Sequence, residues 1–396
     1  MMKIMSVNAG SSSLKFQLLN MKNEEVLCDG LFERIGNTNT IFKIKTPGHK
    51  QEQIVPISDH KQAVEMLLEY LIEKKFIQTL DEIDGVGHRI VQGGEYFKNS
   101  VVLTEENIKQ VESLNDLAPL HNPANLLSIK VFKKVLPQTL QVGVFDTNFH
   151  QTMQEQNFLY ATPYEWYQKY KIRKYGFHGI SYQYISQKAQ EIFQKPNLKL
   201  IVCHAGNGVS LTAIENGKSV DTSMGFTPLE GVPMGTRSGN VDPNVVTFIA
   251  DKENKTAKEV INELNKKSGL LGVSGISNDG RDLENMIQKN NKRALLAFEI
   301  QIKRVVDYIA SYYVLLKGAD ALIFTAGIGE NSSFFRREVV KRLEALNIYL
   351  DQDLNDQRLP GERVISTSES AVKVMVIPTN EEIAIARDVV ALKQQN

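Results

Sequence analysis

The chain has 396 residues, of which 42% are hydrophobic and 23% are charged, and its 46 basic side chains balance its 46 acidic ones. This composition is typical of a globular protein, and the length is enough for two domains of ordinary size. Because the net charge is zero and no block of five like charges occurs, we expect no nucleic-acid partner, and no apolar stretch approaches the ~20 residues that span a bilayer.

Strand and helix patterns alternate in the first half of the chain. Residues 4–8 predict a strand, a turn rich in glycine and serine follows, and residues 14–19 predict a second strand, so the two form a β-hairpin. Apolar residues at helical spacing predict helices over residues 62–75 and 124–136. The apolar run 142–144 indicates a further strand.

The second half continues the alternation. The predicted elements are, in order, strands over residues 200–203 and 209–214, a helix over 293–316, a strand over 321–325, a helix over 331–346, a strand over 372–377 and a last helix over 379–394. We expect Asn331 to cap the helix that it begins. Strands mixed with helices throughout the chain predict α/β layers.

Two short segments that are separated by about half the chain resemble each other. Residues 8–12 and residues 204–208 are both turns of small residues between two predicted strands. One interpretation is a duplication that produced two related domains, each with a hairpin of this kind. The alternative is a chance likeness between two glycine-rich turns.

The turn after the first strand has the composition of a phosphate-binding loop. The hydroxyls of Ser11 and Ser13 and the amides of the turn could donate to phosphate oxygens, and Lys15 adds a positive charge. Asn8, at the end of a strand, could hold a hydrated Mg²⁺. Taken alone, a serine-rich turn is more often only a hairpin turn.

Two glycine motifs look like nucleotide-binding fingerprints without matching them. Gly217-Lys218-Ser219 lacks the first glycine of a P-loop and lies between two strand-like runs, which predicts a hairpin turn. Residues 327–331 lack the dinucleotide-binding spacing, although their glycines would let an adenine ring or a phosphate approach the backbone. A plain strand-to-helix turn explains this second motif equally well.

Several polar residues lie in glycine-rich or strand-end positions. Arg89 precedes a double glycine and Arg237 has glycines on both sides, and a guanidinium can bind carboxylate or phosphate oxygens with two parallel hydrogen bonds. Asp146 follows a predicted strand, and His178 and His121 stand near glycine or proline. Surface ion pairs and purely structural roles are the alternatives.

The two cysteines, Cys28 and Cys203, stand alone in the sequence. This spacing favours buried apolar side chains over a disulfide framework or a metal site. The first residues lack the long apolar region of a signal peptide. A cytoplasmic enzyme is therefore the expectation.

Together these segments resemble the acetokinase family, and the likeness runs almost end to end. The matching segments, in the family's order, are residues 8–15, 204–208, 221–231, 237–239, 327–331 and 379–382. The resemblance implies an acetate kinase, with reversible, direct in-line transfer of the γ-phosphoryl group of ATP to acetate. It implies Mg²⁺ as the metal, with Mn²⁺ as a substitute.

The resemblance also implies a fold and an assembly. The family belongs with sugar kinases, actin and heat-shock ATPases, which implies two duplicated actin-like or ribonuclease H-like α/β domains. Each would have a mixed sheet flanked by helices, with the active site in the cleft between them. The N-terminal domain would comprise residues 1–148 with 381–396, and the C-terminal, nucleotide-binding domain residues 149–380. A homodimer is implied as well.

The resemblance further implies roles for individual residues. The catalytic residues would be Arg89, Asp146, His178 and Arg237. Because a carboxylate nucleophile is already ionised at neutral pH, Asp146 would orient an arginine rather than act as a base. Mg²⁺ would be held by Asn8 and Glu381. Arg89 would bind the substrate carboxylate, beside an apolar pocket lined by Val91, Leu120, Phe177 and Pro228. ATP would be bound by Ser11, Ser13, Lys15, His204, Ala205, Gly206, Asn207, Gly208, Asp279, Gly280, Arg281, Gly327, Ile328, Gly329, Glu330 and Asn331.

Two alternatives stay open at this point. A propionate or butyrate kinase of the same family would differ only in its apolar pocket, and one methylene changes binding by only ~1–3 kcal/mol. A superfamily ATPase that serves as a binding or structural module would leave Arg89, Arg237 and His178 without a role. The sequence departs from the family pattern at Gln92, Asn148, Asn240 and Gly280, none of which is assigned to the chemistry.

Overall fold

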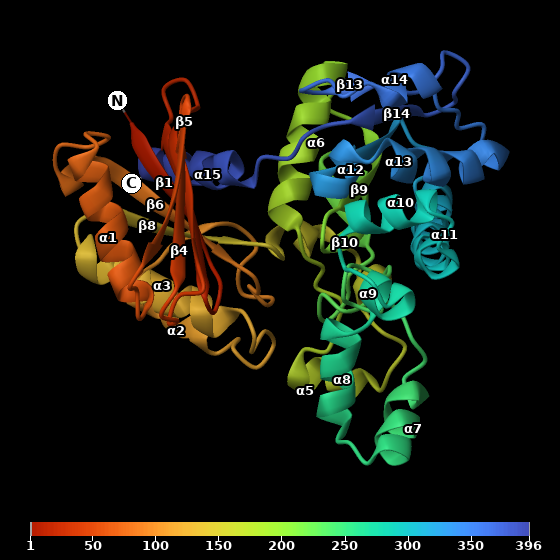
Figure 1. Ribbon diagram of the computed structural model, residues 1–396, viewed down its shortest axis with the longest axis horizontal. Helices are drawn as coiled ribbons and strands as arrows, with labels where there is room; N and C mark the ends of the chain where they lie inside the picture. The colour runs from red at the N-terminus through yellow and green to blue at the C-terminus, as the bar shows by residue number, and fades with distance from the viewer. Residues whose placement is uncertain (1, 396) are drawn as a thin grey trace. The chain divides into compact units, whose positions relative to one another are not determined.

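The described part of the chain, residues 2–395 of the computed structural model, forms two compact units (Figure 1). Unit 1 comprises the residues up to Gln151 and those from Asn380 onward, and unit 2 is Thr152–Thr379. Each unit has one mixed sheet with helices packed on it, so the predicted α/β class is confirmed. The active site expected between the two domains stays a prediction.

Unit 1 is built on an eight-stranded sheet in the order β5-β4-β3-β2-β1-β6-β8-β7. Its strands are β1 (Lys3–Ala9), β2 (Ser13–Asn20), β3 (Glu25–Glu33), β4 (Thr40–Thr46), β5 (His49–Val55), β6 (Ile83–Ile90), β7 (Val101–Val102) and β8 (Leu140–Phe145). Its helices are α1 (His60–Glu73), α2 (Glu105–Glu112), α3 (Asn122–Val135) and α15 (Glu381–Gln395). The predicted hairpin is the antiparallel pair β1 and β2. Because β1, β6 and β8 are parallel neighbours, their carboxyl ends lie at one edge of the sheet.

Side-chain alternation along β6 assigns its residues to two faces of the sheet. A Cβ added at Gly85 would lie 2.6 Å from Val389 of α15, so glycine lets that helix approach the strand closely. His88, which is out of phase with Gly85, packs on the other face against Phe132 of α3, with ring centroids 5.3 Å apart. Arg89 is in phase with Gly85 and therefore lies on the face that α15 covers.

Polar caps set where two helices of unit 1 begin. The side chain of Asp59 accepts a hydrogen bond of 2.9 Å from the backbone of Gln62, so α1 begins two residues before its predicted start. The side chain of Asn380 accepts a hydrogen bond of 3.1 Å from the backbone of Ile383. This contact at the start of α15 places Glu381 in the first turn of the helix.

Unit 2 contains a six-stranded sheet in the order β11-β10-β9-β12-β14-β13. Its strands are β9 (Lys199–Ala205), β10 (Val209–Glu215), β11 (Lys218–Thr222), β12 (Ala321–Thr325), β13 (Arg363–Val364) and β14 (Lys373–Val376). Its helices are α4 (Glu155–Phe158), α5 (Tyr164–Tyr170), α6 (Gly179–Phe193), α7 (Asn244–Glu253), α8 (Ala257–Lys266), α9 (Gly269–Ser274), α10 (Gly280–Gln288), α11 (Lys292–Leu315), α12 (Ala326–Asn331), α13 (Ser333–Val340) and α14 (Gln352–Asp356). The predicted hairpin between β10 and β11 is confirmed, with φ of 53° at Asn216 and 76° at Gly217.

The helix expected to begin at Asn331 is a wrong prediction. Residues 326–331 already form α12, and Asn331 is its last residue. The helix starts directly after β12 because Ala326 adopts a left-handed φ of 65° and its N–H donates to the side chain of Glu330 at 2.8 Å. The cap of the following helix is Ser332, whose hydroxyl accepts from the backbone of Phe335 at 2.9 Å. The glycine motif 327–331 is therefore a helical turn rather than a loop.

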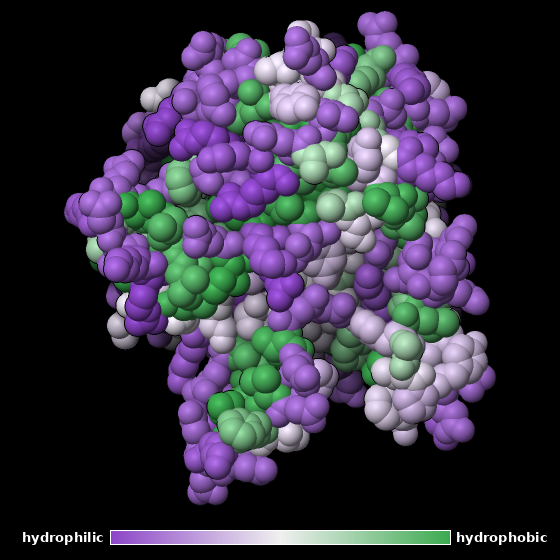
Figure 2. All heavy atoms as spheres, turned by 90° about the vertical axis from the view of Figure 1, so that its right-hand side faces the viewer, coloured by the Kyte–Doolittle hydropathy of each residue, from purple (hydrophilic) through white to green (hydrophobic). Residues whose placement is uncertain are grey.

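Exposed apolar side chains occur on the helices of unit 2. Examples are Phe248 on α7 and Leu296 on α11, which are 60% and 48% exposed. Figure 2 shows apolar groups gathered in patches among the polar surface on the side of the molecule that faces right in Figure 1. Within residues 2–395, no helix combines the length and the apolar character needed to cross a membrane.

Candidate active site

In unit 1, an arginine and an aspartate meet at the ends of two neighbouring strands. Arg89 lies near the end of β6, and Asp146 follows β8 directly. The guanidinium donates from Nε to Asp146 Oδ1 at 2.9 Å and from Nη2 to Oδ2 at 2.5 Å, which is a two-pronged ion pair. Burial by itself would lower the pKa of Arg89, but the charge of fully buried Asp146 and these hydrogen bonds raise it above its ordinary value. The guanidinium of Arg89 therefore stays charged.

A small pocket opens beside this ion pair. Its lining comes from β1, β2, β6 and α15, and consists of Ser6, Asn8, Lys15, Phe16, Arg89, Glu381, Glu382 and Ile385. Arg89 Nη1 donates to Asn8 Oδ1 at 3.3 Å, and Lys15 forms an ion pair with Glu382. Burial raises the pKa of Glu381 to about 7, and the charge of Arg89 opposes that shift. The structure thus brings together the predicted residues Asn8, Lys15, Arg89, Asp146 and Glu381.

The donors of this pocket fit a magnesium ion. Mg²⁺ prefers oxygen ligands, and the pocket offers the amide oxygen of Asn8 and the carboxylates of Glu381 and Glu382. A cation would also stabilise the ionised form of Glu381, which burial disfavours. No cluster of three acidic, histidine or cysteine residues able to hold a metal occurs within residues 2–395. An ion bound here would therefore complete its coordination with water and phosphate oxygens.

The remaining residues predicted for unit 1 are not among those that line this pocket. Ser11 is exposed and Ser13 half-buried, in the turn that Gly10 N–H closes by donating to the Ser13 carbonyl at 2.9 Å. Val91 is buried, whereas Leu120 is 64% exposed. The other two residues predicted for the apolar pocket belong to unit 2: Phe177 is buried and Pro228 half-buried. A common pocket for these four side chains stays a prediction.

In unit 2, two histidines, an arginine and a glycine turn gather at the end of β9. The rings of His178 and His204 stack with centroids 4.1 Å apart. His178 precedes α6 in a left-handed conformation, with φ of 58°. A Cβ added at Gly208 would lie 3.3 Å from His178 Nε2 and 3.6 Å from Arg237 Nη1. The turn therefore presents bare backbone beside both polar groups, with buried Ala205 and residues 206–207 completing it.

Arg237 has no carboxylate partner among residues 2–395. Its guanidinium donates at 3.5 Å to the sulfur of Met234, which is a weak acceptor. Burial lowers the pKa of Arg237, but a guanidinium starts so high that it stays charged. A half-buried cation that lacks a carboxylate partner among these residues and lies beside a glycine turn is suited to bind an anion.

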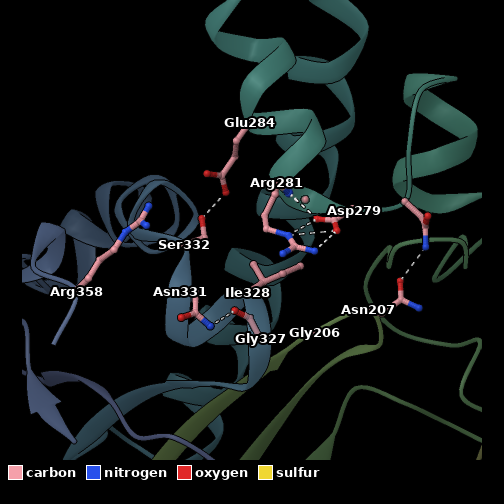
Figure 3. Close-up of a pocket in the computed structure, with 12 residues that line it drawn as sticks. Gly206, Asn207, Asp279, Arg281, Glu284, Gly327, Ile328, Asn331, Ser332 and Arg358 are labelled. Atoms are coloured by element: carbon pink, nitrogen blue, oxygen red, sulfur yellow. Dashed lines mark hydrogen bonds and ion pairs between the residues drawn. The ribbon is translucent and has the colours of Figure 1, made fainter. Parts of the chain in front are cut away.

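Next to the glycine turn lies a cavity of about 630 Å³ (Figure 3). It is lined by Gly206, Asn207, Asn278, Asp279, Gly280, Arg281, Glu284, Gly327, Ile328, Asn331, Ser332 and Arg358. Most of the predicted ATP-binding residues of unit 2 are in this set. Gly329 and Glu330 are not, because the helical turn of α12 directs them away; the Glu330 carboxylate instead accepts from the backbone of Ala326 and Thr379.

Sequence reasoning missed four residues of this cavity. Glu284 lies one helical turn after Gly280 on α10, so helix spacing could have found it. Its carboxylate accepts a hydrogen bond of 2.5 Å from Ser332. Asn278 adjoins a predicted residue, but Arg358 lies in an irregular segment that carries no sequence signal.

Comparison with known proteins gives consistent matches over the whole chain. Residues 3–387 match the acetokinase family. The chain is 65% identical over 394 residues to an acetate kinase of Chlorante-Aster yellows phytoplasma, covering 99% of this chain and 96% of that one. The crystal structure of Porphyromonas gingivalis acetate kinase superposes with a TM-score of 0.94 at 44% identity, covering 99% of this chain and 100% of the other. A propionate kinase structure from Francisella tularensis gives 0.93 at 41%, with 98% and 99% covered. The expected fold is thereby confirmed.

Proposed function

The chain belongs to the acetokinase family, and on that premise we propose that it phosphorylates acetate. The reaction is a reversible, direct transfer of the γ-phosphoryl group from ATP to a carboxylate oxygen, giving acetyl phosphate and ADP. The observation that carries the proposal is Arg237, a half-buried guanidinium with no carboxylate partner in residues 2–395, beside a bare glycine turn and a cavity of nucleotide size. Phosphoryl transfer depends mainly on positioning and on stabilising charge, which such a site supplies.

Arg89 is proposed to bind the carboxylate of the acid. Three of its five N–H groups are engaged by Asp146 and Asn8, which leaves two for a substrate. Asp146 accepts both prongs of the fork and so fixes the plane of the guanidinium. Because acetate is ionised at neutral pH, no base is needed, and Asp146 acts by orienting Arg89.

The phosphate groups are proposed to be bound by unit 2. Arg237 and His178 would donate to the oxygens of the transferred group, and the amides of residues 207 and 208 to the neighbouring phosphates. Asn8 and Glu381 would hold Mg²⁺, or Mn²⁺ in its place. When bound, the ion neutralises charge on the phosphates during transfer.

The test is acyl phosphate formation, trapped as the hydroxamate, with MgATP and acetate, propionate or butyrate. We expect acyl phosphate to form from acetate, with a kcat/KM for acetate that is higher than those for propionate and butyrate. A preference for propionate would instead favour the function named for the Francisella tularensis structure. ATP hydrolysis without any acyl phosphate would refute the proposal.

We also propose that the protein is a cytoplasmic homodimer. The exposed apolar side chains of α7 and α11, such as Phe248 and Leu296, support an interface because apolar patches on a protein surface commonly mark contact sites. Both cysteines are free and buried, as suits a reducing compartment. Sedimentation equilibrium is expected to give twice the chain mass, and a monomer at micromolar concentration would argue against the dimer.

A further inference from the structure

Serine hydroxyl groups contact the Nδ1 atoms of both histidines in the unit 2 site. His178 Nδ1 lies 2.8 Å from Ser210 Oγ, and His204 Nδ1 lies 2.9 Å from Ser181 Oγ. Ser210 Oγ also lies 2.6 Å from the phenol oxygen of Tyr182. Both Nδ1 atoms are thus engaged by serines, and Nε2 of His178 is the ring nitrogen that lies beside the glycine turn.

The proton of Ser210 decides the state of His178. The hydroxyl has one proton and two partners, so it donates to one and accepts from the other. Burial raises the pKa of Tyr182, which therefore keeps its own proton. If Tyr182 donates to Ser210, then Ser210 donates to His178 Nδ1, and the neutral ring carries its proton on Nε2. The opposite direction would put the proton on Nδ1 and leave Nε2 only an acceptor.

The surroundings of His178 disfavour a charged ring. His204 is stacked on it, and the guanidinium of Arg237 lies near the same glycine, Gly208, as His178 Nε2. A positive charge this close to another raises the energy of an imidazolium. Either neutral tautomer avoids that repulsion, and the tautomer protonated on Nε2 places an N–H donor beside the glycine turn.

We propose that Ser210 is a positioning residue that holds His178 as the neutral tautomer protonated on Nε2, ready to donate to the phosphoryl group during transfer. The inference rests on the proposed function, which supplies the substrate of His178. A donor fixed in advance stabilises developing charge without reorganisation during the reaction. Ser210 itself touches no substrate and acts through the ring.

Long-range ¹H–¹⁵N NMR of the full chain, labelled at histidine, reads the tautomer without substrate. The His178→Gln variant assigns the signals of His178 by their loss. At neutral pH we expect the Nε2-protonated tautomer in the wild type and a mixture of tautomers in Ser210→Ala. A wild-type ring protonated on Nδ1, or on both nitrogens, would overturn the proposal, and so would an unchanged tautomer in Ser210→Ala.

Kinetics supply the second readout. Losing one hydrogen bond is expected to lower kcat of Ser210→Ala roughly 10-fold, with KM for MgATP changed by no more than about twofold. Ser186→Ala is the matched control, because Ser186 is also buried and its hydroxyl has no partner among residues 2–395. An equal loss of kcat in the control would show that packing alone is responsible. A wild type that makes no acyl phosphate would refute the proposed function, while the NMR result would still decide the tautomer.

Discussion

Replacing Arg89 with alanine should affect stability and activity through separate causes. The change removes hydrogen bonds of 2.9, 2.5 and 3.3 Å and leaves the fully buried Asp146 carboxylate without its cation. Breaking a buried ion pair by deleting one partner destabilises a protein by roughly 3–5 kcal/mol. Losing a donor that stabilises substrate charge should in addition lower kcat/KM for acetate by ~10²-fold or more.

The double variant Arg89→Met with Asp146→Asn separates the two effects. Removing both charges of a buried pair is often nearly neutral for stability. The free energy of unfolding in urea should therefore be close to the wild-type value in the double variant and well below it in Arg89→Ala. The kcat/KM for acetate should stay low, since no guanidinium is present. Wild-type kcat/KM in the single variant, or activity that returns with stability in the double variant, would refute the role given to Arg89.

Three further predictions concern other residues. Glu381→Gln should raise the Mg²⁺ concentration needed for half-maximal rate, and an unchanged titration curve would place the metal elsewhere. Arg237→Ala should lower kcat ~10²-fold. It should leave the free energy of unfolding in urea almost unchanged, because removing Arg237 leaves no carboxylate unpaired, and a large loss of stability would contradict this. Burial lowers the pKa of His88 to about 4, so the unfolded chain takes up a proton that the folded one does not as the pH falls from about 6.5 to 4, and stability should drop by roughly 3 kcal/mol over that window. His88→Gln should lack this part of the loss, whereas the exposed control His49→Gln should retain it.

Local patterns in the sequence predicted only part of the fold. The expected elements include strands β1, β2, β8, β9, β10, β12 and β14 and helices α1, α3, α11 and α15, whereas strands β3 to β7 and most helices of unit 2, among them α6, were not expected. The expected elements were accessible because periodicity and turn chemistry act over a few neighbouring residues. Asn331 shows the limit of that reasoning. Its propensity to cap a helix is a local property, whereas the residue at which the helix starts depends on contacts with other parts of the chain. Ala326 keeps its left-handed backbone through the Glu330 side chain, and buried Arg336 donates to the carbonyls of Gly329 and Glu330 at 2.9 Å.

Residues of the candidate active site could be predicted from the sequence only where they belong to a recognisable motif. Arg89 and Asp146 lie 57 residues apart and meet because β6 and β8 are neighbours, which is a matter of strand order that no local pattern encodes. Ser210 is a single serine within a strand, so nothing marks it in the sequence as the partner of His178. The family resemblance supplied the residue roles, and the structure adds the contacts that would let those residues act.

The formation of a bond between acetate and the transferred phosphorus tests the account most directly. Purified protein would be incubated with MgATP and acetate labelled with ¹⁸O in both oxygens, and the products followed by ³¹P NMR. We predict ADP and an acetyl phosphate signal with the isotope shift of one ¹⁸O bound to phosphorus. ADP and inorganic phosphate without acetyl phosphate, or acetyl phosphate without the shift, would contradict direct transfer to the acid.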